Sequence, residues 1–249
     1  MEQPIAQLLP SYHVVVPNRA HYVYDISTTD FDRHLEVIRA ASGYANCPLT
    51  FDDCHISQFR YALPLLQQHG LKARFFAVVG WTGKRRDYMT WLHLKELRAA
   101  GHEVQSHSFS HVPLTCCGRE ELSRELRHSR HELEQKLGNA VDLISVPFGR
   151  WNQRVVEASA HAGYRRVYTS DPMSPMRIAG IDVLGRFIVR RSTTRDQLRR
   201  VLSDDQRELR WLRTRQRLSL LVRASIGDST YFKIWATLRS GKQPVADSR

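Results

Sequence analysis

Two adjacent carboxylates and a pair of histidines are the residues of this chain whose types and spacing can do chemistry. Asp52 and Asp53 directly follow a short apolar segment, and His107 and His111 stand four residues apart. Two imidazoles and one carboxylate can occupy one face of a divalent transition metal ion and leave positions for water and substrate. We therefore expect Asp53, His107 and His111 to hold a metal ion, with Asp52 as the base that takes a proton from water.

Each of these signals is weak when taken singly. A chain with 12 histidines contains H-x-x-x-H pairs without function, and a D-D pair after a strand is often a turn or a helix cap. The four-residue spacing predicts that His107 and His111 lie on the same side of one helical turn. The combination of both pairs with a later Pro147-Phe148-Gly149 turn favours an active site.

Short apolar runs alternate with amphipathic segments along most of the chain. The patterns predict strands at 12–16, 48–51, 73–79, 103–107, 141–148 and 165–170, and helices at 29–41, 57–68, 90–100, 120–137 and 153–162. Such alternation predicts an α/β fold with a distorted (β/α) barrel of six to seven parallel strands. Catalytic residues of such barrels lie at the C-terminal ends of the strands, where Asp52, His107 and Pro147 fall.

The last fifth of the chain has a different composition. Residues 199–249 contain 12 Lys and Arg against 5 Asp and Glu, in a chain of net charge +12. We expect a barrel domain at 1–198 and a basic helical extension at 199–249, in which Trp211, Leu218 and Val222 share one helical stripe. A solvated cap on the barrel is the interpretation that we favour. Peripheral contact with an anionic membrane is the alternative, and nucleic-acid motifs are absent.

The cysteines and the N-terminus bear on the cellular compartment. The four cysteines form no C-x-x-C pair, which favours reduced thiols; they are Cys47, Cys54, Cys116 and Cys117. The first residues lack the basic start and apolar run of a secretory signal, and no stretch approaches the ~18 apolar residues of a membrane-spanning helix. We expect a cytoplasmic protein, with attachment at the inner face of the membrane as the variant.

Three segments together resemble a known family. TFDD (50–53), SHSFSH (106–111) and VPFG (146–149) are similar to the first three motifs of the polysaccharide deacetylases, also called NodB-homology or carbohydrate esterase family 4 enzymes. The resemblance covers about residues 12–194. It implies a distorted (β/α) barrel that hydrolyses N-acetyl groups on amino sugars, with Zn2+ or another divalent transition metal as cofactor and an N-acetylated glycan as partner.

The resemblance also assigns roles to residues. Asp52 matches the family's catalytic base, and the metal ligands match Asp53, His107 and His111. Phe148, between Pro147 and Gly149, matches the residue whose backbone N–H helps to hold the oxyanion. A fixed donor at that place stabilises a transition state by roughly 3 kcal/mol.

Three positions depart from the family pattern. Cys54 replaces the usual Gly after the D-D pair, and Ser145 replaces the usual Arg two residues before the motif-three Pro. The late Leu-x-His motif that supplies the general acid is absent. The only histidine after Phe148 is His161, on a predicted amphipathic helix, which we expect at the surface.

His13 is the candidate that fills the missing acid position. Tyr12-His13 resembles a branch of exopolysaccharide (poly-N-acetylglucosamine) deacetylases in which the acid-bearing strand comes first; a packed strand histidine is the equally weighted alternative. His55 is a weaker candidate. Arg186, with Phe187, is expected to open the last barrel strand, where it could bind substrate, replace the missing Arg beside Asp52, or form a surface ion pair.

The sequence therefore predicts a metal-dependent hydrolase that removes N-acetyl groups from an amino-sugar polysaccharide or a lipid-linked glycan precursor, in exopolysaccharide or envelope biosynthesis. One alternative keeps the chemistry and acts on a small ureide-type amide. Another, raised by the departures at Ser145 and in the acid motif, is a weakly active or inactive barrel that binds glycans or assists assembly at a membrane.

Overall fold

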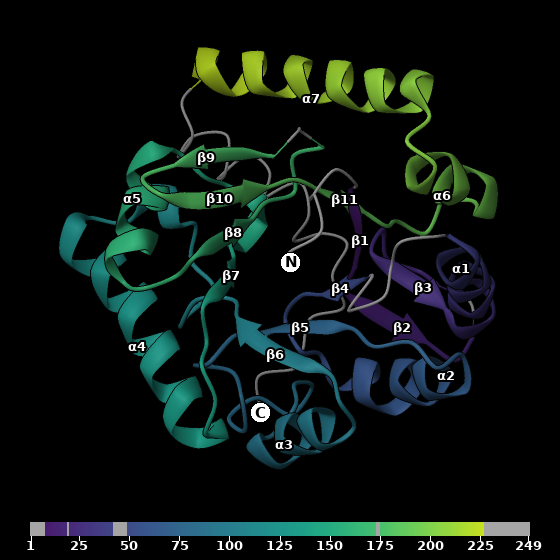
Figure 1. The fold of residues 1–249 in the computed structure, drawn as a ribbon, viewed down its shortest axis with the longest axis horizontal. Coiled ribbons are helices and arrows are strands. Elements are labelled where there is room, and N and C mark those ends of the chain that lie inside the picture. Colours follow the sequence, from purple (N-terminus) through teal and green to yellow (C-terminus); the bar gives the residue numbers. More distant parts are fainter. Residues whose placement is uncertain (1–7, 19, 42–48, 173–174, 227–249) are drawn as a thin grey trace.

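The computed structural model describes residues 8–18, 20–41, 49–172 and 175–226, which form a ring of strands with helices outside it (Figure 1). The main sheet runs in the order β11-β1-β4-β5-β6-β7-β8-β10-β9. Its strands are β1 (Leu9–Tyr12), β4 (Thr50–Phe51), β5 (Arg74–Ala77), β6 (Glu103–Ser106), β7 (Leu143–Ser145), β8 (Arg166–Tyr168), β9 (Met176–Ile178), β10 (Ile181–Leu184) and β11 (Arg186–Ile188).

One extended segment closes the ring. β10 and β11 are separated by Gly185 alone, yet β10 pairs with β8 and β11 pairs with β1, both in parallel. Among the described strands of the main sheet, only β9 runs antiparallel, against β10. The predicted α/β barrel of parallel strands is thus confirmed.

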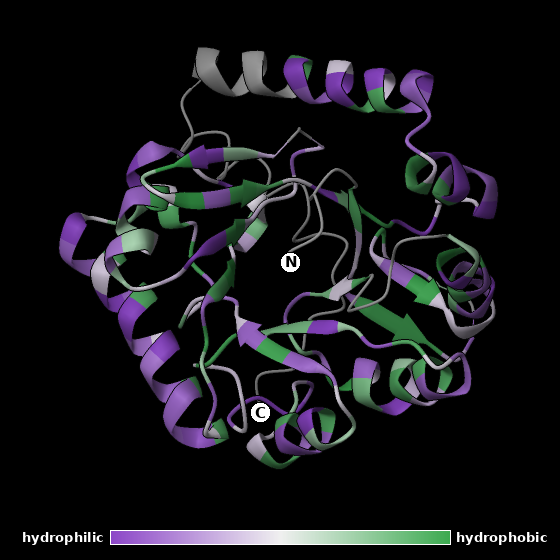
Figure 2. Ribbon diagram, viewed as in Figure 1, coloured by the Kyte–Doolittle hydropathy of each residue, from purple (hydrophilic) through white to green (hydrophobic). Residues whose placement is uncertain are grey.

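Seven helices surround the strands in the described part of the chain, and Figure 2 shows hydrophilic residues mostly on their outer sides and hydrophobic residues toward the ring. They are α1 (Thr28–Ala40), α2 (Leu63–Gln68), α3 (Trp91–Ala99), α4 (Arg119–Leu137), α5 (Gln153–His161), α6 (Arg195–Leu202) and α7 (Gln206–Ile226). A π-helical turn, η1 (Gln58–Ala62), leads into α2.

Local capping explains why several helix boundaries were predictable. The side chains of Ser27, Thr90 and Asn152 accept backbone N–H groups at the starts of α1, α3 and α5. Gly138 ends α4 in the left-handed conformation (φ 71°), which glycine adopts without steric cost. These signals lie within a few residues of the boundary and can be read without tertiary information.

The first predicted strand, 12–16, is wrong in its bounds. β1 ends at Tyr12, and the run that follows, β2 (Val14–Val16), pairs with β3 (Asp25–Ser27) in a separate two-stranded sheet. Three successive valines favour a strand whichever sheet accepts them, because β-branched side chains suit any half-buried pleated surface. His13 therefore lies between two strands, directly after the C-terminal end of the first barrel strand.

The chain beyond the last barrel strand continues onto the outside of the barrel. α6 buries Leu198, Val201 and Leu202 in the main core, and Arg195 pairs with Glu36 of α1 at 3.1 Å. The predicted domain boundary between 198 and 199 falls inside this helix. Residues 227–249 of the predicted extension lie outside the described residues, as does Cys47.

Two further sequence predictions concern membranes and disulfides. In the part of the chain that the structure describes, no helix combines the length and the apolarity needed to cross a membrane. Cys54, Cys116 and Cys117 form no disulfide among the described residues. Burial raises the pKa of the Cys54 thiol well above its ordinary value, so that this thiol stays protonated.

Candidate active site

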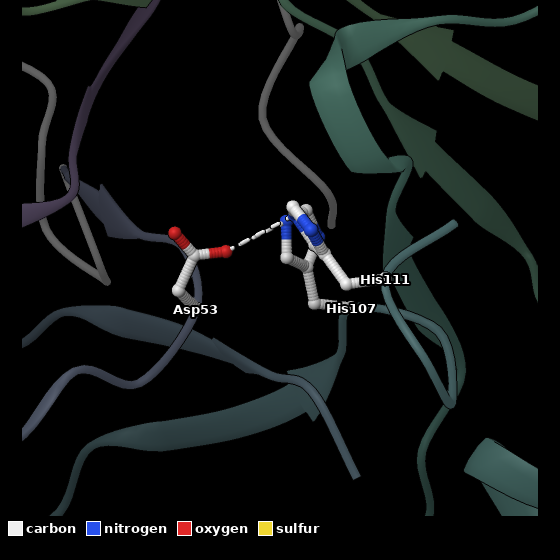
Figure 3. A group of neighbouring side chains, drawn as sticks. All are labelled: Asp53, His107 and His111. Atoms are coloured by element: carbon white, nitrogen blue, oxygen red, sulfur yellow. Dashed lines mark ion pairs between the residues drawn. The ribbon is translucent and has the colours of Figure 1, made fainter. Parts of the chain in front are cut away.

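Asp53, His107 and His111 converge at the C-terminal ends of β4 and β6. The Nε2 atom of each histidine lies 3.3 Å from Oδ1 of Asp53, and the three donor atoms lie within 4.8 Å of one another. Figure 3 shows the carboxylate and both imidazoles pointing toward one another from two separate segments. The structure thus brings together the three residues that the sequence predicted as metal ligands.

The donor set fits a divalent transition metal ion. Two donors that each lie about 2.0–2.1 Å from a tetrahedral zinc ion are about 3.3–3.4 Å apart. Oδ1 of Asp53 is buried and meets no hydrogen-bond donor among the described residues, as expected for an oxygen that a cation satisfies. Burial alone would raise the pKa of Asp53, but His111 and His107 hold it well below its ordinary value, so the carboxylate is ionised.

The backbone carbonyl of Ser145 orients His107. Nδ1 of His107 lies 2.7 Å from this oxygen, so Nδ1–H donates to it and the Nε2 lone pair faces the ion site. Because His107 is only 2% exposed, its ring has little freedom to turn away. β7 therefore fixes a ligand that β6 supplies.

The segment from His107 to His111 is a loop, so the predicted helical turn is wrong. Ser108 and His111 have φ values of 64° and 62°, and no helix is assigned between them. The loop turns back on itself and brings the second imidazole beside the first, with ring centroids 4.9 Å apart. The spacing of four was informative about proximity and misleading about backbone conformation.

Glu125 of α4 holds this loop in place. Its Oε2 accepts the backbone N–H groups of Phe109 (3.0 Å) and Ser110 (2.9 Å), and its Oε1 accepts the Ser110 hydroxyl. The side chain is 7% exposed. The sequence did not reveal this role, because Glu125 is one of several acidic residues in a highly charged helix and no local signal distinguishes it.

Backbone strain is concentrated at the site. A non-glycine residue with positive φ costs of order 1–3 kcal/mol and persists where the surroundings over-determine the conformation. In the described chain, seven non-glycine residues have positive φ, and five of them lie at the site: Asp53 (72°), Cys54 (52°), Ser108 (64°), His111 (62°) and Phe148 (59°). The left-handed conformation of Cys54 also explains why glycine suits that position.

A buried arginine holds Asp52. Nη1 and Nη2 of Arg186 each donate to a different oxygen of the carboxylate at 2.8 Å, and the Ser145 hydroxyl donates to Oδ2 at 3.2 Å. Burial would raise the pKa of Asp52, but the guanidinium and neighbouring His107 outweigh it and lower the pKa to about 2. Asp52 is therefore a fixed carboxylate that is ionised at neutral pH.

Arg186 takes the place of the arginine that the family pattern has at position 145. Its side chain is 0% exposed, and Nη2 also donates to Oγ of Ser145 at 2.7 Å. A surface ion pair is thereby excluded. Because the guanidinium is fully buried and donates to both Asp52 oxygens, the structure favours the role of carboxylate partner over the substrate-binding role that the sequence also allowed.

His13 lies at the same end of the barrel as the metal ligands. Its Nδ1 is buried and meets no hydrogen-bond partner among the described residues, and its ring stacks on Tyr24 at 4.9 Å. Burial lowers the pKa of His13, while the charges of Asp53 and Asp52 act in the opposite direction. Both carboxylates of the site therefore act on the pKa of the His13 imidazole.

Gln58 links the backbone of His13 to that of Asp52. Its Nε2 donates to the carbonyl oxygens of His13 (2.5 Å) and Asp52 (2.6 Å), and the residue is 0% exposed. Gln58 opens the π-helical turn η1, a rare conformation that is frequent at functional sites. This clamp fixes the spacing between the first and second barrel strands at the site.

The other two histidine candidates have local partners. Nδ1 of His55 accepts the backbone N–H of Ser57 at 3.2 Å, and the ring packs edge-on against Tyr88. His161 is exposed on α5 with its Nδ1 bonded to the Glu157 carbonyl, as expected for a surface residue. Both histidines thus have local hydrogen-bond partners at Nδ1, which His13 lacks among the described residues.

The Pro147-Phe148-Gly149 turn borders the metal site. The Phe148 ring lies 4.7 Å from that of His111. Gly149 has φ 65°, and a Cβ there would stand 2.2 Å from the side chain of Ser170, so only glycine fits. Pro147 and Gly149 are buried and shape the turn that positions the Phe148 backbone.

Trp81 and Tyr88 form an aromatic border of the site that the sequence did not predict. The Trp81 ring lies 4.8 Å from His111 and 4.6 Å from Tyr88, and the Arg85 guanidinium lies 4.3 Å above the indole. The position of Trp81 two residues after the predicted strand 73–79, at the catalytic end of a predicted barrel, was the available signal.

Comparisons of sequence place these features among known proteins. The family model for polysaccharide deacetylase matches residues 45–167. Over 151 residues the chain is 33% identical to the chitooligosaccharide deacetylase of Sinorhizobium fredii, covering 59% of this chain and 67% of that protein. It is 31% identical over 165 residues to the chitooligosaccharide deacetylase of Rhizobium leguminosarum bv. trifolii, covering 63% and 68%. The match to YxkH of Bacillus subtilis, at 27% identity, spans half the length of that relative.

Solved structures with the same fold include a Streptococcus pyogenes deacetylase in complex with acetate. It has a TM-score of 0.70 at 20% identity and covers 80% of this chain and 99% of that one. IcaB from Ammonifex degensii has a TM-score of 0.65 at 22% identity, covering 85% and 98%. At these identities the likeness establishes the fold alone.

The buried ion pair yields a stability prediction. Arg186→Met leaves the Asp52 carboxylate buried without its counter-charge, and we expect it to lower the free energy of unfolding by about 3–5 kcal/mol in urea denaturation at pH 7. The double variant Asp52→Asn/Arg186→Met removes both charges and should recover most of that loss. A double variant as unstable as the single one would contradict the pairing argument.

The loop support yields a second prediction. Glu125→Gln replaces one acceptor oxygen by a donor and removes the charge, and we expect zinc affinity to fall about tenfold in competition with a chromogenic chelator. Glu121→Gln, at an exposed position of the same helix, is the matched control and should bind zinc like the parent protein. Equal affinities for both variants would show that Glu125 does not support the ligand loop.

Proposed function

This chain belongs to the polysaccharide deacetylase family, and we propose that it removes N-acetyl groups from an amino-sugar glycan with a divalent metal ion held by Asp53, His107 and His111. The observation that carries the proposal is the pairing of that ligand cluster with Asp52, an adjacent carboxylate kept ionised by Arg186. The two carboxylates are consecutive in sequence and have different partners, as a base and a ligand require.

The chain's own residues divide the work of amide hydrolysis. A divalent ion held by this cluster would polarise the carbonyl of the substrate and lower the pKa of the attacking water. Asp52 accepts the proton of the attacking water, and the bidentate contact with Arg186 fixes the direction of its oxygens. In this proposal the backbone N–H of Phe148 stabilises the negative charge that develops on the carbonyl oxygen, and its strained turn beside His111 supports that role.

His13 is our candidate for the proton donor to the leaving amine. The amine leaves readily only when protonated, and an imidazole can hold and release a proton near neutral pH. Asp52 and Asp53 favour the protonated ring, while burial opposes it. Two observations support this role. Nδ1 of His13 is buried and has no hydrogen-bond partner among the described residues. Gln58 also ties the backbone carbonyl of His13 to that of Asp52.

The proposed substrate is an N-acetylated polysaccharide or a lipid-linked glycan precursor used in exopolysaccharide or envelope synthesis. Two of the relatives named above are chitooligosaccharide deacetylases, which supports an amino-sugar substrate. The Tyr12-His13 pair at the end of the first barrel strand supports the exopolysaccharide branch. Trp81 beside His111, and Tyr88 beside Trp81, give this border of the site an aromatic character that suits contact with a sugar ring.

The base assignment predicts the behaviour of Asp52→Asn. We expect acetate release from N-acetylglucosamine oligomers to fall at least ~100-fold, because the variant has no carboxylate to accept the proton. Zinc content measured by mass spectrometry should stay at the parental level, whereas Asp53→Asn should lose zinc. Asp182→Asn serves as the control, because it removes a carboxylate that pairs with Arg166 and Arg177 away from the metal ligands. Parental turnover in Asp52→Asn would refute the assignment.

The acid assignment predicts a dependence on the leaving group for His13→Gln. Turnover of the N-acetyl sugar should fall ~100-fold or more through kcat, because the amine needs a proton to leave. Turnover of an activated acetate ester, such as p-nitrophenyl acetate, should be nearly unchanged, because its leaving group departs as an anion. Equal losses on both substrates would assign His13 to positioning instead of proton donation.

A further inference from the structure

The solvent side of α7 combines apolar and cationic residues in a way that the deacetylase site does not use. Among the described residues only four large apolar side chains are exposed, and two of them, Trp211 (52%) and Leu218 (60%), lie on this helix. They stand seven residues apart, about two helical turns, and therefore on the same side. We define the outer face of α7 as these two residues with the exposed Arg207, Arg210, Arg215 and Arg217.

The opposite side of α7 is fixed to the barrel. Leu209 is 4% exposed and belongs to the main core. Glu208 accepts from Arg200 at 3.0 Å and from Gln197 at 2.8 Å, both on α6. Gln216 bonds to Asp171 on the loop after β8. These contacts set the rotation of the helix, so the outer face points away from the barrel.

All the charged residues of the outer face are cationic. Glu208, the only acidic residue between 206 and 226, is turned inward toward α6. Within the described ranges, no salt bridge involves Arg207, Arg210, Arg215 or Arg217. Arg215 lies over the Trp211 ring at 5.6 Å, which keeps this charge beside the apolar stripe. Figure 1 shows α7 at the edge of the molecule, outside β9 and β10, and the residues of the outer face are exposed.

We propose that the outer face of α7 binds an anionic phospholipid surface, lying in the plane of the membrane. Trp and Leu enter the boundary between headgroups and acyl chains, while arginines on both sides of them contact lipid phosphates. This inference stands on α7 alone and does not depend on the deacetylase reaction.

Charge and shape decide against other occupants. A second copy of the chain would set arginine against arginine across a twofold axis, which is unfavourable. A nucleic acid would satisfy the arginines, but Leu218 in the centre of the face offers nothing to a phosphate or a base edge. An anionic membrane satisfies both parts of the face.

Flotation with lipid vesicles tests the proposal on the full chain. We expect binding to phosphatidylcholine vesicles that contain about one third phosphatidylglycerol to be roughly tenfold stronger than to phosphatidylcholine alone, and to weaken at about 0.5 M salt. Trp211→Ala/Leu218→Ala and Arg207→Gln/Arg215→Gln should each reduce binding about tenfold. Leu92→Ala, at an exposed leucine of α3 (64%), is the matched control and should bind like the parent.

Three results would overturn the proposal: equal binding to neutral and anionic vesicles, undiminished binding by both double variants, or binding of a double-stranded RNA probe that the same variants abolish while no vesicle binding is seen. The substituted side chains are exposed, so the variants should unfold at the parental temperature. Their acetate release from soluble sugar oligomers should also be unchanged, which separates this surface from the active site.

Discussion

The contact between Arg186 and Asp52 is the interaction on which barrel and site both depend. From β11 the guanidinium donates to Ser11 of β1, Thr50 of β4 and Thr169 after β8, in addition to the Asp52 carboxylate and Ser145 of β7. Every donor nitrogen of this fully buried cation is used, as a buried charge requires. One side chain thus joins strands from the beginning, middle and end of the chain and holds the proposed base.

The second constraint is the backbone turn between the two carboxylates. Consecutive side chains in an extended strand point to opposite faces. After β4 the chain leaves the extended conformation, and Asp53 adopts φ 72°. The Asp52 carboxylate contacts Arg186 and the Asp53 carboxylate contacts the two histidines, so that one dipeptide supplies two groups with different partners. The strain in this turn is compensated by the contacts of Asp52 and by the bond between its backbone N–H and the Tyr12 carbonyl.

From the sequence alone, Ser145 in place of the family's arginine raises the alternative of a weakly active or inactive barrel. The structure removes that ground, because Arg186 delivers the same charge to Asp52 from a different strand, and Ser145 contributes a hydroxyl to the same network. The position of a charge in space matters to the carboxylate, and its position in the chain does not. Our proposal for the proton donor follows the same reasoning, because His13 precedes the other site residues in sequence and lies at the same end of the barrel.

The sequence by itself determined the candidate metal ligands, the neighbouring Asp52, the alternation of strands and helices and several helix boundaries, because these depend on residue type and on contacts within a few positions. It misassigned the first strand and the His107–His111 turn. A local pattern specifies only a tendency, and the path of the backbone depends on the strands and side chains that pack against it in the fold. Only the tertiary structure decided that Arg186 pairs with Asp52, 134 residues away, and that Glu125 and Gln58 fix the site. Such partners carry no local signal, because they are selected by the geometry of the closed barrel.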